Sequence, residues 1–352
     1  MASGAPVFRT RVLNHVGIIC CLVVISILLM NQKLLSKFYR ESRGGVIKVN
    51  KASTNSHPKT RVETLVVGES EKWFMEMMAQ RMRDRRELLQ AKCKKMGLDT
   101  ESAKPVKFVL AKKYKFAYCF IPKTGCTNWK KVIMLLNGYA KSQKELDAID
   151  HDRLHGIVAK KYLTLNVGVP PAIKDYMKFV VVRDPYERLV SAYRNKIAKQ
   201  DNLEKPQYYK ISYAIRQKYG SNYTSDKTKR KEATFEEFVD YLIDGNNSDK
   251  FSVIENHWSN YNRVCSMCTI HYDVIAHMET IEEDSRYMLM LLKAPKHVQL
   301  PKGYNNTGSS VINVDSVNQY YRDLSPDKMF KLYETYVGDF QMFGYPFRDL
   351  RI

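Results

Sequence analysis

The stretch CFIPKTGCTNWKK, residues 119–131, limits the possible folds of this chain more than any other feature. The apolar run Phe116–Ile121 has the composition of a buried strand and stops at a proline. After a turn of small and hydroxylated residues, Thr127–Leu136 has the pattern of a helix, and Gly138 is a stop signal just past its end. A strand that passes into a helix in this way is typical of an α/β domain.

A second strand and helix follow the same plan. The run KFVVV, residues 178–182, predicts another buried strand, and Asp184-Pro185 is a helix start. One face of that helix carries Tyr186, Leu189, Val190 and Tyr193. Repeated strand–helix units predict a parallel sheet, in which ligands collect at the carboxyl ends of the strands. Lys123 and Arg183 both stand at such ends.

The first turn has the features of an anion-binding loop. A helix that begins near Thr127 offers unpaired N–H groups and a positive dipole end. Thr124, Gly125 and Cys126 are small enough for a phosphate to reach the backbone, and Lys123 adds a full charge. The Walker A pattern G-x-x-x-x-G-K-[ST] is absent. The spacing alone also fits a strand-end lysine that only meets solvent.

The second turn adds a further cation, because arginine suits bidentate binding of phosphate. Arg183 ends the strand, and Ser191 lies about two turns along the next helix. Arg188 is open to two readings: it assists at the same site, or it pairs with Glu187 or another acid. Two phosphate sites on one α/β domain imply a nucleotide that carries phosphates at both ends.

The two segments PKTGCTNWKK (122–131) and VVRDPYERLVSAYRNK (181–196) resemble the donor-binding motifs of sulfotransferases. They are most similar to the Golgi carbohydrate sulfotransferases of the chondroitin/dermatan 4-O-sulfotransferase and HNK-1 sulfotransferase group. The similarity continues through residues 257–284 and 332–345, covers roughly residues 85–345 and is closest to the chondroitin 4-O-sulfotransferases. The chain departs from their pattern at Thr124-Gly125, where we expect an aliphatic or small pair.

This resemblance implies a P-loop-like sulfotransferase domain with a parallel sheet, and 3′-phosphoadenosine 5′-phosphosulfate as the donor. It implies a site for the 5′-phosphosulfate formed by Pro122, Lys123, Thr124, Gly125, Cys126, Thr127 and Asn128. It assigns the 3′-phosphate to Arg183 and Ser191, with Arg188 as a further donor-binding candidate. Lys123 would neutralise charge on the leaving phosphate, and no metal is required.

The acceptor hydroxyl needs a base, and histidine works near neutral pH with little tuning. His151 and His155 lie between the two donor motifs, where related sulfotransferases often place a catalytic His or Glu. We expect His155 to be the catalytic residue, from its position. His257 is an alternative on the acceptor side.

The expected reaction is transfer of a sulfuryl group to a glycosaminoglycan, at the 4-O position of GalNAc in chondroitin. Dermatan and N-glycan GalNAc or HNK-1-type acceptors remain alternatives. The net charge of +20 agrees with a polyanionic partner, and we expect a glycan rather than nucleic acid. A basic cluster in a long insertion is the proposed acceptor contact, unless it is only a solvated loop: Lys199, Lys210, Lys218, Lys227, Lys229, Arg230 and Lys231.

The N-terminus predicts a membrane anchor. Residues 1–15 would be a cytoplasmic tail, 16–35 a signal-anchor helix, 36–104 a lumenal stem and 105–352 the catalytic domain of a single-pass type II Golgi protein. The sequons at Asn222, Asn246 and Asn305 support lumenal exposure. A cleaved signal peptide is the alternative, although no A-x-A-like site follows. The flanking positive charges slightly favour the opposite orientation.

Helical spacing of apolar residues at 71–92 predicts a helix, which either forms a stem or homodimer contact or packs on its own domain. Five cysteines follow the anchor, so at least one stays free or pairs between chains. Cys265 and Cys268 form a C-x-x-C pair for which disulfides or structural thiols are favoured over zinc, because no finger-like ligand pair accompanies them.

Two other functions compete. Asp150-His151-Asp152 has the D-x-D form that glycosyltransferases use to hold a metal and a nucleotide sugar, but this reading leaves both phosphate turns unexplained. A membrane-tethered lectin would explain the charge, but not Lys123, Arg183 and Ser191 together.

Overall fold

The computed structural model describes residues 60–198, 206–221, 232–244, 255–301 and 314–350. The chain divides into two compact units, residues 1–64 and 65–352, and the following concerns the second. The predicted tail, anchor segment and three sequons lie outside the described residues, as do Lys199, Lys227, Lys229, Arg230 and Lys231. No helix within the described ranges combines the length and apolar character needed to span a membrane.

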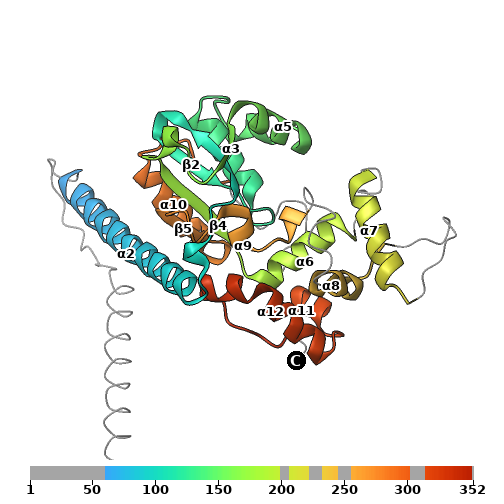
Figure 1. The fold of residues 1–352 in the computed structure, drawn as a ribbon. Helices are drawn as coiled ribbons and strands as arrows, with labels where there is room; N and C mark the ends of the chain where they lie inside the picture. Colours follow the sequence, from blue (N-terminus) through green and yellow to red (C-terminus); the bar gives the residue numbers. More distant parts are fainter. Residues whose placement is uncertain (1–59, 199–205, 222–231, 245–254, 302–313, 351–352) are drawn as a thin grey trace, which may run out of the picture. The chain divides into compact units, whose positions relative to one another are not determined.

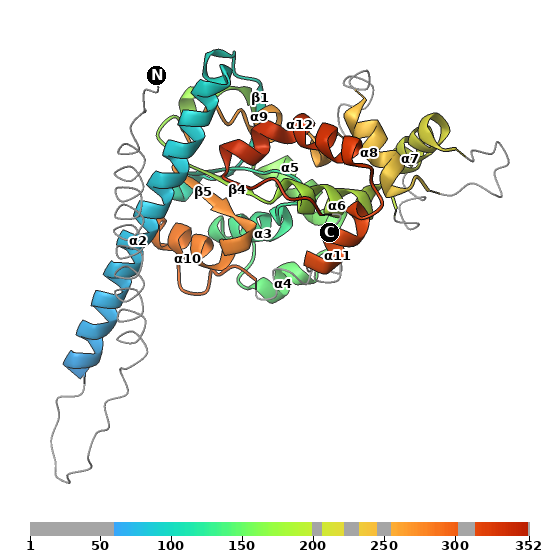
Figure 2. The same cartoon turned by 90° about the horizontal axis from the view of Figure 1, so that it is seen from below.

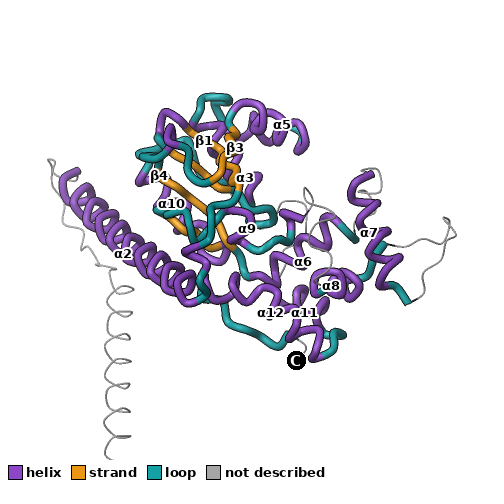
Figure 3. Tube along the Cα trace, viewed as in Figure 1, coloured by secondary structure: helices purple, strands orange, loops and turns teal. Residues whose placement is uncertain are grey.

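Five strands form one mixed sheet in the order β3-β1-β2-β4-β5 (Figure 3). Their bounds are β1 Pro105–Ala111, β2 Phe116–Cys119, β3 Leu163–Val167, β4 Met177–Val182 and β5 Val274–His277. Strands β2, β4 and β5 are parallel, whereas β1 runs antiparallel to β2 and to β3. The predicted parallel pairing is therefore right for the pairs β2–β4 and β4–β5 and wrong for the two pairs that β1 makes. The short connection from β1 to β2 explains the difference, since so few residues can only join antiparallel neighbours.

Helix α2 precedes the strands in the chain, and the other helices lie between the strands or after them (Figure 1). They are α2 (Thr60–Lys95), α3 (Cys126–Leu136), α4 (Gln143–Asp147), α5 (His151–Lys161), α6 (Pro185–Lys196), α7 (Pro206–Tyr219), α8 (Phe235–Ile243), α9 (Tyr261–Cys265), α10 (Ile281–Leu291), α11 (Val314–Tyr321) and α12 (Pro326–Met342).

The local helix signals in the sequence are confirmed at the end of α3 and at the start of α6. Gly138 has a left-handed φ of 70° just after α3, the conformation that glycine adopts at helix ends. Asp184 caps α6 by accepting a hydrogen bond from the Glu187 N–H, and Pro185 is its first residue. Strand β2 is shorter than predicted and ends at Cys119, three residues before Pro122, which has no N–H to donate to a neighbouring strand.

Alternate residues of the central strands face opposite sides of the sheet, as a pleated strand requires. In β4, Phe179 and Val181 join a cluster with side chains from α2, α3, α5 and α10. Val180 and Val182 join a second cluster with side chains from α9 and the end of α12. A third cluster lies among helices α6, α7, α8, α11 and α12, away from the sheet.

Helix α2 packs on its own domain, which confirms one of the two interpretations made from the sequence (Figure 2). Phe74, Met78 and Met82 are buried in the first cluster. On the same helix, the Arg85 guanidinium donates to the fully buried carboxylate of Asp284 in α10 at 2.8 Å. The compact unit that begins at residue 65 therefore includes this helix, which the sequence placed in the stem.

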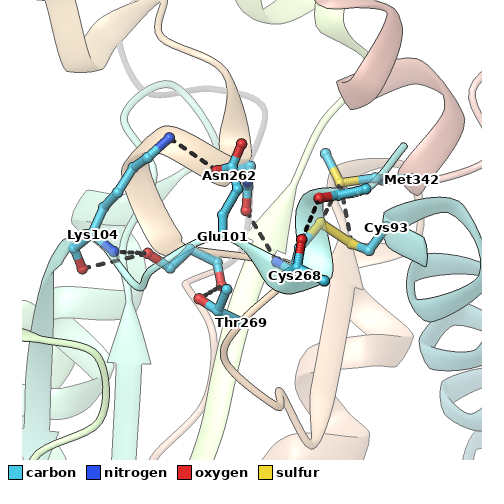
Figure 4. The surroundings of a disulfide bond; sticks show 10 residues. Cys93, Glu101, Lys104, Asn262, Cys268, Thr269 and Met342 are labelled. Atoms are coloured by element: carbon cyan, nitrogen blue, oxygen red, sulfur yellow. Dashed lines mark hydrogen bonds and ion pairs between the residues drawn. A yellow bond between two sulfur atoms is a disulfide. The ribbon is translucent and has the colours of Figure 1, made fainter. Parts of the chain in front are cut away.

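Two disulfides join segments far apart in sequence, Cys93–Cys268 and Cys119–Cys265. Figure 4 shows the first, between α2 and the loop after α9, with both sulfur atoms within 3.8 Å of the Met342 sulfur. Cys265 and Cys268 are thus bonded to different partners and offer no thiolate for zinc. Cys126 is the free cysteine among the described residues, as the odd count required. Bonds of this kind typically contribute about 2–4 kcal/mol each to stability.

Candidate active site

The loop after β2 turns sharply into α3. Lys123 and Gly125 both have left-handed backbone conformations, with φ of 74° and 71°. For a lysine this conformation is strained by about 1–3 kcal/mol, and it persists because neighbouring contacts hold it. One such contact is the hydroxyl of buried Thr124, which donates to the Ile121 carbonyl at 2.9 Å. Contacts within the loop therefore fix the direction of its backbone and of Lys123.

Lys123 lies in a group of cations. The pKa of its amine is lowered to about 8, mainly by burial. Cys126 acts in the opposite direction, and the charges of Lys196, Arg183 and Arg194, each with a smaller effect than Cys126, add to the lowering. Like charges brought this close repel each other, so a bound anion would relieve the repulsion and raise the pKa again. The electrostatics of the loop favour a polyanionic ligand.

Arg183 follows the last residue of β4, which runs parallel to β2 and pairs with it. Its guanidinium donates twice to the Glu187 carboxylate, at 3.1 and 3.2 Å, one turn along α6. Its backbone is held by Tyr261, whose hydroxyl donates to the Arg183 carbonyl at 2.5 Å. The structure thus brings Arg183 and Lys123 to the same edge of the sheet, as the sequence predicted. Pairing with Glu187, considered for Arg188, belongs to Arg183.

Arg188 is buried, with 1% of its side chain exposed. Its three guanidinium nitrogens donate to backbone carbonyls of Pro122 at 3.2 Å, Ser259 at 2.7 Å and Asn256 at 3.1 Å. It therefore ties the start of the loop to the segment before α9, and its nitrogens face carbonyls rather than a ligand. This geometry points to a supporting role instead of the direct donor contact expected from the sequence.

Ser191 lies half-buried two turns along α6, and no hydrogen bond joins it to Arg183 in the part of the chain that the structure describes. In α3, Asn128 is buried and donates its backbone N–H to the Gly125 carbonyl at 3.1 Å. Asn128 therefore closes the first turn of α3.

His155, on α5, is brought to the loop. Its Nε2 lies 3.2 Å from the Thr127 hydroxyl, and its Nδ1 lies 3.1 Å from the amine of Lys130. Burial lowers the pKa of His155 to about 3, and the charge of Lys130 adds to this effect. The imidazole is therefore neutral and contacts the helix that starts at the loop.

The other two histidine candidates are less closely tied to the loop. His151 is exposed, its Nδ1 lies 3.1 Å from the Asp152 carboxylate, and its ring stacks 4.3 Å from that of His155. His257 contacts the aromatic ring of Tyr208, 6.3 Å away. Asp150 of the D-x-D pattern caps α5 by accepting from two backbone N–H groups. This cap engages the carboxylate that a glycosyltransferase would need for its metal.

Two lysines near the loop were not singled out from the sequence. Lys130 is three residues after Thr127, so both lie on one face of α3, a spacing that could have found it. Lys196 ends the second motif, and its charge acts on both Lys123 and His155. Of the basic insertion, Lys210 and Lys218 lie on α7 within the described residues, and Lys218 pairs with Asp244.

Comparison with known proteins agrees with this arrangement. The sulfotransferase family profile matches residues 106–346. Carbohydrate sulfotransferase 11 of Mus musculus is 35% identical over 242 residues, 67% of this chain and 66% of the mouse protein. Carbohydrate sulfotransferase 9 of Homo sapiens is 34% identical over 270 residues, 74% of this chain and 59% of the human protein. Carbohydrate sulfotransferase 10 of Rattus norvegicus is 34% identical over 272 residues, 74% of this chain and 75% of the rat protein.

The matched region spans less than two thirds of the mouse and human proteins. No solved structure matches the chain. The family profile nevertheless covers both strand–helix turns and His155 between them. The chain therefore belongs to the sulfotransferase family.

Proposed function

We propose that the protein transfers a sulfuryl group from 3′-phosphoadenosine 5′-phosphosulfate to a hydroxyl of a glycosaminoglycan. The observation that carries this proposal is the position of Lys123 and Arg183 at the ends of two adjacent parallel strands, among cations that lower the pKa of Lys123. Such a site suits a ligand with anionic groups at two places. The donor has a phosphosulfate at one end and a 3′-phosphate at the other.

Each donor-binding residue then has a separate task. The loop from Pro122 to Asn128 receives the phosphosulfate, with α3 contributing the N–H groups of its first turn. Lys123 stabilises the charge that grows on the bridging oxygen as the sulfur–oxygen bond breaks. Arg183 and Ser191 bind the 3′-phosphate. The Arg183 guanidinium then either contacts the phosphate and Glu187 together, or breaks its ion pair with Glu187 to bind the phosphate.

His155 is the proposed catalytic residue on the acceptor side. It comes from α5, contacts Thr127 in the first turn of α3, and so stands beside the place where the sulfuryl group would lie. A general base must be within hydrogen-bond reach of the proton that it removes. The imidazole is neutral in the structure, but its low pKa means that it needs a second group to take up that proton.

The proposed acceptor is GalNAc in chondroitin, sulfated at its 4-O position. The support is the resemblance of the two donor motifs and the net charge of +20, which suits a polyanionic chain. The test is incubation of the full chain with labelled donor and with desulfated chondroitin, dermatan and N-glycan acceptors, followed by disaccharide analysis. We expect label at the 4-O position of GalNAc. If label is found only on dermatan or N-glycan acceptors, the proposed acceptor is wrong but sulfuryl transfer is supported. If no glycan is labelled, the proposed reaction is wrong.

We also propose a Golgi membrane location with the catalytic domain in the lumen. The two disulfides support it, because such bonds persist in oxidising compartments. If the domain is lumenal, peptide N-glycosidase will increase the electrophoretic mobility of the protein made in secretory cells, through Asn222, Asn246 or Asn305. Replacing all three asparagines by glutamine is the control. An unchanged mobility of the wild-type protein would remove this support.

A further inference from the structure

Lys130 is a buried cation beside the candidate active site. Its side chain is 5% exposed, and its amine lies 3.9 Å from the centre of the Phe120 ring and 3.1 Å from Nδ1 of His155. No carboxylate pairs with it among the residues that the structure describes. A buried lysine is costly to keep charged without an acidic partner, so its contact with His155 calls for an explanation.

The hydrogen-bond chain fixes where the protons are. A charged lysine can only donate, so Nδ1 of His155 accepts from it. The neutral imidazole then carries its hydrogen on Nε2, which donates to the Thr127 hydroxyl at 3.2 Å. In this state His155 has no lone pair left for an acceptor hydroxyl. If Lys130 is neutral, the chain reverses: Nδ1–H donates to the amine, and the lone pair of Nε2 becomes available.

We propose that Lys130 is a positioning residue that sets which nitrogen of His155 is protonated, and that it takes up through the imidazole the proton lost by the glycan hydroxyl. This inference rests on the proposed sulfuryl transfer. It resolves the conflict between the position of His155 and its weak basicity. A histidine with a pKa of about 3 holds a proton poorly, but a neutral amine behind it can receive that proton instead.

The proton and electron balance is complete without any further reagent. The O–H bond of the glycan breaks as an N–H bond forms at Nε2 of His155, while the Nδ1–H bond breaks as an N–H bond forms at Lys130. The glycan oxygen bonds to sulfur, and the sulfur–oxygen bond to the donor phosphate breaks. Its electron pair stays on the phosphate oxygen near Lys123. The step ends with a neutral imidazole and a charged Lys130, which then returns its proton to solvent.

The surroundings of Lys130 favour the neutral form of its amine. Burial lowers the pKa of Lys130, and Lys107 on β1 lowers it further, whereas Cys126 on its own helix acts in the opposite direction. Around His155, the charges of Lys130, His151 and Lys196 lower the imidazole pKa, and Asp152 raises it. Burial is the largest effect on both groups and favours the deprotonated form of the pair, while the nearby charges act in both directions.

The experiment compares K130M and K130R with the wild type by measuring kcat/KM against pH. In the wild type we expect an ascending limb set by loss of the proton from Lys130, whose pKa burial lowers from that of an ordinary lysine. In K130M the amine is gone, so the limb follows His155 itself and moves to lower pH, because burial still lowers the pKa of the imidazole, and the plateau falls. In K130R the guanidinium never loses its charge, so kcat/KM falls by about 10²–10⁴-fold at every pH.

K131M is the matched control, since Lys131 is the next residue of α3 and pairs with Asp147 at 2.6 Å. Its pH profile should equal that of the wild type. The proposal is overturned if K130R retains wild-type kcat/KM, or if K130M folds and its ascending limb does not move. If K130R does not fold, K130M decides alone, because methionine fills similar space over the Phe120 ring.

A second measurement does not depend on activity. The ¹⁵N chemical shifts of the His155 ring, assigned with H155N, should show the Nε2–H form in the wild type near neutral pH. In K130M, the imidazole should become protonated at a higher pH than in the wild type. Equal titration of His155 in both proteins would overturn the inference. Failure of the wild type to bind adenosine 3′,5′-bisphosphate in calorimetry would instead refute the proposed function, and the ring titration would still decide the role of Lys130.

Discussion

Replacing Lys123 by alanine is expected to lower kcat by about 10²–10³-fold, the usual effect of removing a group that stabilises charge developing in a transition state. Lys123 is held in a strained left-handed conformation at the end of the turn into α3. In the proposed site its amine is the charge assigned to the leaving phosphate, and the loop contacts that hold Thr124 fix the neighbouring backbone.

The measurement is kcat at saturating donor and a pH near 7, where a lysine with a pKa of about 8 is mostly charged. Lys131→Ala is the matched control, because that side chain points to Asp147 on α4. It should leave kcat within about twofold of the wild type, because Lys131 pairs with Asp147 and lies outside the proposed donor site. Retention of wild-type kcat by Lys123→Ala, with unchanged thermal stability, would remove Lys123 from the chemistry and with it the proposed role of the loop.

Both strand–helix turns could be predicted from the sequence because their signals are local. A proline and a run of small residues mark the first turn, and Asp184-Pro185 marks the second. The cap at Asp184 and the stop signal at Gly138, after α3, are where the pattern put them. The sheet order could not be predicted in the same way. Strand β1 pairs antiparallel with β3, more than fifty residues later, and nothing in either segment encodes that pairing.

The residues of the candidate site also differ in whether local sequence signals could identify them. Lys123 and Arg183 were found because strand ends are recognisable in a sequence. The role of Arg188 could not be found in this way, because it depends on the carbonyls of Asn256 and Ser259, which the fold brings from about seventy residues away. Lys130 shares a helix face with Thr127, but its contact with His155 also depends on how α5 packs against α3. A buried cation looks like any surface lysine in a sequence.

The cysteines illustrate a further limit. The spacing of Cys265 and Cys268 allowed a zinc site, a bond between the two, or bonds to other cysteines. In the structure, β2 places Cys119 beside α9, and α2 places Cys93 beside the loop that follows α9. Only the packing of α2 on the domain brings Cys93 close to Cys268.

Arg183→Ala is expected to weaken binding of adenosine 3′,5′-bisphosphate by roughly 10- to 150-fold, since a hydrogen bond to a charged group is typically worth about 1.5–3 kcal/mol. With adenosine 5′-monophosphate, which lacks the 3′-phosphate, the penalty should largely vanish, because the two deletions remove one interaction. Lys123→Ala should behave differently and weaken both nucleotides, because its partner is the 5′ group.

The ion pair with Glu187 changes how this experiment must be designed. Removing Arg183 leaves the Glu187 carboxylate, which accepts two hydrogen bonds from it, beside the proposed phosphate site. Repulsion from that carboxylate would enlarge the apparent loss. The cycle is therefore repeated in a Glu187→Gln background, by calorimetry at fixed salt, where the loss with the bisphosphate should be smaller but still depend on the 3′-phosphate. If Arg183→Ala weakens both nucleotides equally in that background, Arg183 does not contact the 3′-phosphate, and its place in the proposed donor site is wrong.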